Sequence, residues 1–133
     1  MPSFATPSTF DPGPFLLALD GDEETFTAFG RDFLATFPGA LACLSAAANG
    51  SNVESLGERS HALKGAVAIF HAHGVERELA AIETACRTQP DSNWQGLVAA
   101  LAGPASAFAF ELDFYCEHVS AGGPATLSIA ERT

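Results

Sequence analysis

Residues 26–44 read FTAFGRDFLATFPGALACL. Large apolar side chains recur in this stretch every three or four residues, at Phe26, Phe29, Phe33, Phe37, Leu41 and Leu44. That spacing places them on one face of an α-helix, because the helix turns once every 3.6 residues. Pro38 falls inside the pattern and is expected to kink the helix or divide it. The stretch predicts a long amphipathic helix with one face in a core.

The same periodicity continues on both sides of this stretch. A short helix is expected around residues 15–19, and Asn49-Gly50 is typical of a helix end. Further helices are expected from Ser51 toward Gly74, over 75–89, and from Ser92 toward Val119, with polar residues at their starts suited to capping. No segment alternates apolar and polar residues as a strand does.

These segments predict an all-α fold: an antiparallel four-helix bundle with up-down-up-down connectivity and a short additional N-terminal helix. Residues 11–119 are expected to form the bundle. Residues 1–10, rich in Pro, Ser and Thr, are expected to be a flexible lead-in, and residues 120–133 a flexible C-terminal tail.

Composition narrows the function classes. The chain has 133 residues, 47% of them apolar, and a formal charge of −10 with only six Lys and Arg. Nucleic acids and anionic membranes need clustered basic residues, so neither is an expected partner. Cys43, Cys86 and Cys116 lie in apolar stretches and are expected to be reduced core residues. With no signal peptide and no apolar segment of about 18 residues, we expect a soluble, cytoplasmic monomer.

One of the expected helices, over residues 51–70, carries a histidine that the packing of a core does not explain. On a helical wheel of residues 51–70, the apolar side chains of Leu56, Leu63 and Val67 gather opposite His61, so the imidazole is expected to face outward. An exposed histidine with incidental glycines is the alternative interpretation.

Small residues surround this histidine on its own face. Gly57 lies one turn before His61, Gly65 one turn after it, and Ala68 follows. A mid-helix glycine costs about 1 kcal/mol relative to alanine, so we interpret the bare patch as room for a docking partner. Lys64, the only lysine of the chain, lies three residues after His61 and is expected to offset the charge of an anionic group carried on the imidazole.

The stretch His61-Ala62-Leu63-Lys64-Gly65-Ala66 resembles the signature H-x-L-K-G-[SA] of histidine phosphotransfer (HPt) domains. The resemblance covers about residues 10–118. It includes the acidic step Gly21-Asp22-Glu23 before an aromatic-rich helix, and the positions of Phe70, Ile82 and Glu83. One departure is His71, which stands where the family usually has a glycine at the helix end; Gly74 is expected to take that place.

The resemblance implies a role in two-component signal transduction. His61 would be the phosphoacceptor of a phosphorelay, exchanging a phosphoryl group with aspartates of response-regulator receiver domains, with an upstream and in some cases hybrid histidine kinase as source. Such a chain is a phosphocarrier and not an enzyme. It has no cofactor and no ATP site of its own, and Mg²⁺ is expected only on the partner receiver.

Two alternatives stay open. An HPt-like adaptor would bind kinases or receivers without carrying phosphate, although it would need neither His61 nor Lys64. A metal-binding helical bundle is the other, prompted by His71-Ala72-His73. Alternate residues on a helix point apart and no nearby Cys or acidic residue has ligand spacing, so we expect no metal site.

Overall fold

The computed structural model describes residues 8–89 and 91–120, and within them it contains five helices and no β-strand. The helices are α1 (Gly13–Ala18), α2 (Glu23–Asn49), α3 (Val53–Ala68), α4 (His73–Thr88) and α5 (Trp94–Ser120). The predicted all-helical fold with a short first helix is confirmed. Neither Pro38 in α2 nor Pro104 in α5 divides its helix.

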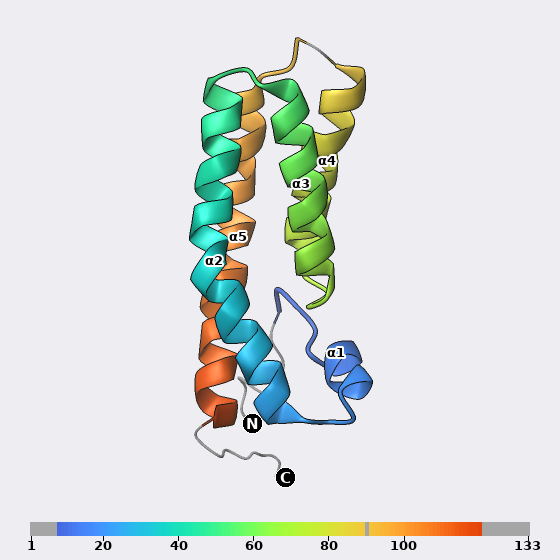
Figure 1. Ribbon diagram of the computed structural model, residues 1–133, viewed down its shortest axis with the longest axis vertical. Coiled ribbons are helices and arrows are strands. Elements are labelled where there is room, and N and C mark those ends of the chain that lie inside the picture. Colours follow the sequence, from blue (N-terminus) through green and yellow to red (C-terminus); the bar gives the residue numbers. More distant parts are fainter. Residues whose placement is uncertain (1–7, 90, 121–133) are drawn as a thin grey trace.

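The four long helices share one core. α2 packs against α3 and α5, and α4 packs against the same two helices, so each long helix has two neighbours (Figure 1). The buried side chains come from all four helices and include Phe37, Leu56, Leu79 and Phe108. Burial of these apolar faces is the main stabilising contribution, at about 25 cal/mol for each Å² removed from water.

The N-terminal caps of α3 and α5 lie one residue after the predicted caps, Ser51 and Ser92. Asn52 accepts a hydrogen bond from the Ser55 amide at 3.2 Å, and Asn93 accepts one from the Gly96 amide at 3.0 Å. Asparagine and serine are equally good caps, so the sequence pattern did not separate neighbouring candidates.

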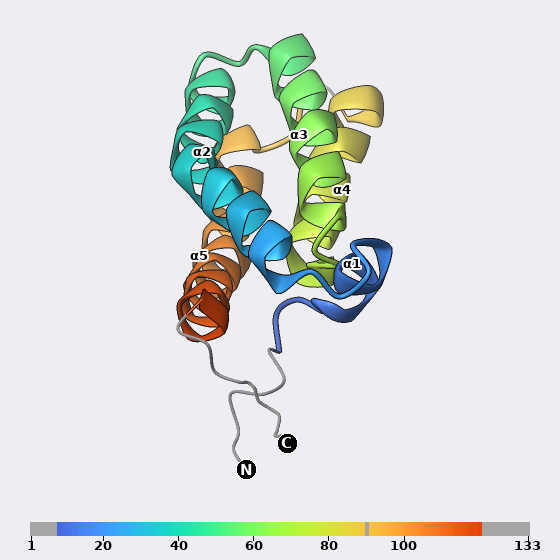
Figure 2. The ribbon, with the colours of Figure 1, turned by 60° about the horizontal axis from the view of Figure 1, so that its bottom comes forward.

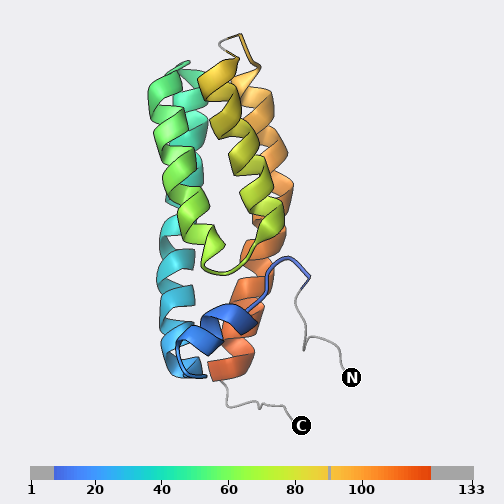
Figure 3. The ribbon, with the colours of Figure 1, turned by 90° about the vertical axis from the view of Figure 1, so that its right-hand side faces the viewer.

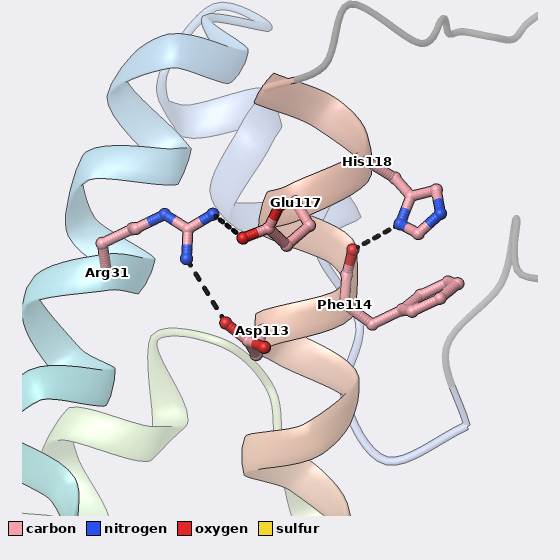
Figure 4. A network of polar contacts seen from close by, with 5 residues as sticks. All are labelled: Arg31, Asp113, Phe114, Glu117 and His118. Carbon is pink, nitrogen blue, oxygen red and sulfur yellow. Dashed lines mark hydrogen bonds and ion pairs between the residues drawn. The ribbon is translucent and has the colours of Figure 1, made fainter.

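The two pairs of helices differ in length. α2 and α5 have 27 residues each, α3 and α4 have 16, so α2 and α5 extend about 16 Å further along the bundle. α1 lies beside this extension, below the turn between α3 and α4 (Figures 1, 2 and 3). Arg31 joins the extended part of α2 to Asp113 and Glu117 of α5 at 3.3 and 3.1 Å (Figure 4).

The segment before α1 is attached to the bundle. Phe10 is buried, with its ring edge against Phe108. Ser8 and Thr9 both donate hydrogen bonds to the Glu111 carboxylate, at 2.7–2.9 Å. Partial burial acts to raise the pKa of Glu111, but the bonds from Thr9 and Ser8 outweigh it and lower the pKa. Residues 8–10 are therefore not the flexible lead-in expected from composition; residues 1–7 and 121–133 of the expected flexible ends lie outside the described residues.

Two expectations drawn from apolar stretches need correction. Cys43 is exposed and Cys86 half-buried, so only Cys116 is a core cysteine. By length and composition, α5 is apolar enough over Trp94–Val119 to cross a membrane, because several of its exposed residues are alanines or phenylalanines, among them Ala99, Ala107 and Phe110. This is weak grounds for a membrane span, since Leu101, Phe108 and Leu112 of the same helix pack into the shared core.

Candidate functional site

His61 lies on the outer face of α3, as the wheel predicts. Leu56, Leu63 and Val67 are buried on the opposite side, while the side chain of His61 is 71% exposed. The imidazole is thus accessible to a second protein, although it stands in the middle of a packed helix.

Glu83 of α4 connects the two charged side chains of the site. Its Oε2 lies 2.7 Å from His61 Nδ1, and its Oε1 lies 2.7 Å from Lys64 Nζ. The Glu83 side chain is only 18% exposed, so the contact between α3 and α4 holds its carboxylate in place. Sequence reasoning noted Glu83 as a position of the HPt pattern but assigned it no role at the site.

The ionisation of Glu83 sets the tautomer of His61. The hydrogen bond from Lys64 lowers the pKa of Glu83 and outweighs the opposing effect of burial; the hydrogen bond from His61 lowers it further. An ionised carboxylate only accepts hydrogen bonds. A neutral His61 ring must therefore carry its proton on Nδ1, which leaves the lone pair on Nε2.

The two glycines beside His61 have different environments. A Cβ atom at Gly65 would meet no other heavy atom within 4 Å, whereas a Cβ at Gly57 would lie 3.3 Å from the Cβ of Cys86 in α4. Gly57 therefore admits the neighbouring helix and does not face open space, and its part in docking a partner stays a prediction. Gly65 faces open space as predicted.

A shallow groove of about 540 Å³ leads from His61 along the α3–α4 boundary. α3 contributes to its lining with His61, Lys64, Gly65 and Ala68, and α4 with His73, Glu76, Arg77 and Ala80. Ala68 thus shares a surface with His61, as expected. Arg77 is a groove residue that the sequence patterns did not single out.

The turn between α3 and α4 differs from the expected one. α3 ends at Ala68, and Gly74 lies in the first turn of α4, so Gly74 does not end the helix. His71 instead adopts a left-handed conformation, with φ of 53°. Glycine adopts this conformation without strain, which explains why the HPt pattern has glycine at this position. The rings of His71 and His73 lie 5.7 Å apart, but no group of three or more His, Cys, Asp or Glu in the described part of the chain is placed to hold a metal ion.

A helical bundle that presents an imidazole to solvent beside a shallow, open groove has the character of a phosphocarrier module. The family model for the Hpt domain matches residues 29–119, and the chain belongs to the Hpt domain family. The matched region contains His61, Lys64 and Glu83. No curated protein and no solved structure matches the chain. Family membership implies involvement in histidine phosphotransfer relays, in which Hpt domains interact with receiver domains and histidine kinases.

Proposed function

We propose that this chain is a phosphorelay intermediate that carries a phosphoryl group on Nε2 of His61. The observation that supports this most directly is the 2.7 Å contact between His61 Nδ1 and the Glu83 carboxylate. It assigns the proton to one ring nitrogen and the nucleophilic lone pair to the other, on a side chain that a partner can reach.

The transfer step follows from this arrangement. The Nε2 lone pair attacks the phosphorus of a receiver's aspartyl phosphate, the P–N bond forms, and the P–O bond breaks with its electron pair leaving on the aspartate carboxylate. The imidazole gains positive charge as the bond forms and keeps its proton on Nδ1. Glu83 faces that proton and stabilises the developing charge. In the return direction the same bonds are exchanged in reverse.

Lys64 serves the phosphoryl group itself. Its ammonium is held by Glu83 at 2.7 Å, one turn of α3 from His61. A phosphoryl group that arrives on Nε2 brings negative charge to the neighbourhood, and Lys64 offsets part of it through a charge-assisted hydrogen bond. The docking surface for the receiver consists of His61, Gly65 and Ala68.

The proposal also covers the partners of the chain, its location and the connectivity of its helices. The receiver supplies Mg²⁺ and activation of its own aspartate, an upstream histidine kinase supplies the phosphoryl group, and the chain itself needs no ATP. It works in the cytoplasm as a monomer. We also infer that α2, α3, α4 and α5 form an antiparallel bundle with up-down-up-down connectivity, which the pairwise packing of these helices supports.

Incubation with a phosphorylated receiver domain tests the proposal. The chain is expected to gain a phosphate that is labile in acid and stable in alkali, and His61→Gln is expected to lose it while its circular dichroism stays helical. Nitrogen NMR of the phosphorylated chain is expected to place the phosphorus on Nε2.

His73→Gln is the matched control, because His73 is equally exposed, at 71%, and lines the same groove. This variant is expected to be labelled like the parent. Undiminished labelling of His61→Gln would refute the proposal, and phosphate on Nδ1 would refute the role given to Glu83.

A further inference from the structure

The charges of the bundle are divided unevenly between its two halves. α3 and α4 carry five acidic and four basic side chains, while α5 carries three acidic side chains and neither lysine nor arginine. The single basic side chain of α2, Arg31, is paired with Asp113 and Glu117. The unpaired positive charge of the described residues therefore lies on the α3–α4 half, which also carries His61.

Within the groove at His61, the basic side chains differ in their contacts. Lys64 contacts Glu83 at 2.7 Å, and His73 Nδ1 lies 3.4 Å from Glu76. Arg77 is exposed, and no carboxylate of the described residues lies within ion-pair distance of it. Among the described residues that line this groove, Arg77 is the one Lys or Arg with no ion pair, so its guanidinium can bind a carboxylate from outside.

The position of Arg77 suits contact with a protein docked over His61. The same groove is also lined by three small residues, Gly65, Ala68 and Ala80, so a partner's backbone can approach closely. Arg77 precedes Glu83 by six residues of α4, which places it about 9 Å from the His61 contact along the helix axis. Arg77 also borders two further grooves, one of them along α4 and the start of α5, so it projects at the rim.

We propose that Arg77 is a specificity-determining docking residue, which binds an acidic side chain on the rim of the receiver domain that docks over His61. This inference rests on the proposed function. A guanidinium forms a bidentate pair with a carboxylate, and a charge at the edge of an interface acts mainly on encounter and partner choice. Arg77 takes no part in the transfer chemistry.

The experiment compares single-turnover transfer from a phosphorylated receiver to the parent chain, to Arg77→Ala and to Arg77→Glu, over a range of chain concentrations. Profiling with the parent identifies the receiver that transfers fastest, and that receiver is used throughout. Arg77→Ala is expected to raise the half-saturating concentration about three- to tenfold and to change the maximal rate less than twofold. Arg77→Glu is expected to raise it further, since it repels the same carboxylate.

Arg59→Ala is the matched control, because it removes the same charge from an exposed α3 side chain that bonds to Ser55 and does not line the groove. It is expected to leave both parameters within twofold of the parent. Raising the salt from about 50 to about 500 mM is expected to shrink the difference between parent and Arg77→Ala, because the contact is exposed.

The outcomes separate this inference from the proposed function. Normal phosphorylation of His61 with an unchanged half-saturating concentration in Arg77→Ala would overturn the role of Arg77 and leave the phosphocarrier role standing. An equal loss in Arg59→Ala would reduce the effect to net charge, and a change of oligomeric state in Arg77→Ala would assign the groove to a second copy of the chain. A parent that accepts phosphate from no receiver would refute both proposals.

Discussion

Replacing Glu83 by alanine removes both carboxylate oxygens that organise the site, one 2.7 Å from His61 Nδ1 and the other 2.7 Å from Lys64 Nζ. A hydrogen bond to a charged partner contributes about 1.5–3 kcal/mol where it is shielded from water. Because the His61 side chain is 71% exposed, we expect the low end of that range. Glu83→Ala should slow transfer to His61 about tenfold, which corresponds to about 1.4 kcal/mol.

The change to glutamine sharpens this prediction. The amide oxygen of the new side chain can still accept from Nδ1, but its NH₂ group can donate to Nδ1 and stabilise the opposite tautomer. Glu83→Gln is therefore expected to transfer at a rate between those of parent and Glu83→Ala. Single-turnover labelling by a phosphorylated receiver measures all three, with Glu78→Gln of the same helix as the control for lost charge.

Lys64 complicates the interpretation, because Glu83→Ala also frees its ammonium. A double-mutant cycle with Lys64→Ala separates the two effects. If Glu83 acts on the imidazole, Glu83→Ala is expected to slow transfer in the Lys64→Ala background as well. The tautomer reasoning would be refuted if Glu83→Ala stays helical and does not slow transfer, either in the parent or in the Lys64→Ala background.

Four further substitutions test the fold. Gly65→Leu is expected to raise the free energy of unfolding by about 0.5–1 kcal/mol and to slow transfer strongly. Gly57→Ala is expected to bring no gain in stability, because the added Cβ would meet Cys86. Thermal melting and labelling measure both variants, and an unfolded Gly65→Leu would contradict the open face at Gly65. His71→Gly is expected to add about 1 kcal/mol by relieving its left-handed conformation, and a lower melting temperature would contradict this. Folding lowers the pKa of Glu111. The carboxylate therefore stabilises the fold above about pH 4.5, and this contribution is lost as the pH falls through the folded-state pKa. Melting of Glu111→Gln between about pH 7 and 3 should show a weaker acid dependence than the parent, and an equal dependence would contradict the contribution of Glu111.

The helices were predictable because their determinants are local. A stripe such as Phe26, Phe37 and Leu44 needs no knowledge of neighbouring helices to indicate a buried face, and all three side chains are buried. The same stripe includes Phe29, which is 50% exposed and has its ring against Phe15 of the short helix α1. Phe26, one turn earlier, is fully buried against Phe70 and Tyr115. Periodicity reports which face is apolar, and helix length and packing determine how much of that face is covered.

The site was only partly predictable, because half of it depends on how α3 is aligned with α4. The outward position of His61 follows from one wheel. The contact with Glu83 joins residues 22 positions apart, and no pattern within either helix reveals it. The same limitation explains Gly57, which shares the face of His61 on the wheel but lies against Cys86. A single-helix wheel does not distinguish open solvent from an adjacent helix.

The asymmetry of the two glycines indicates how a partner reaches His61. On the Gly57 side, α4 approaches so closely that an added Cβ would lie 3.3 Å from Cys86, and the Nδ1 edge of the ring is occupied by Glu83. On the Gly65 side, space is open and continues into the groove toward Ala68. Under the proposed function, a phosphorylated receiver would approach along α3 from the C-terminal side of His61, where the described residues leave space open. An approach over the groove would bring the receiver within reach of Arg77, so the two proposals place phosphotransfer and docking specificity on one surface.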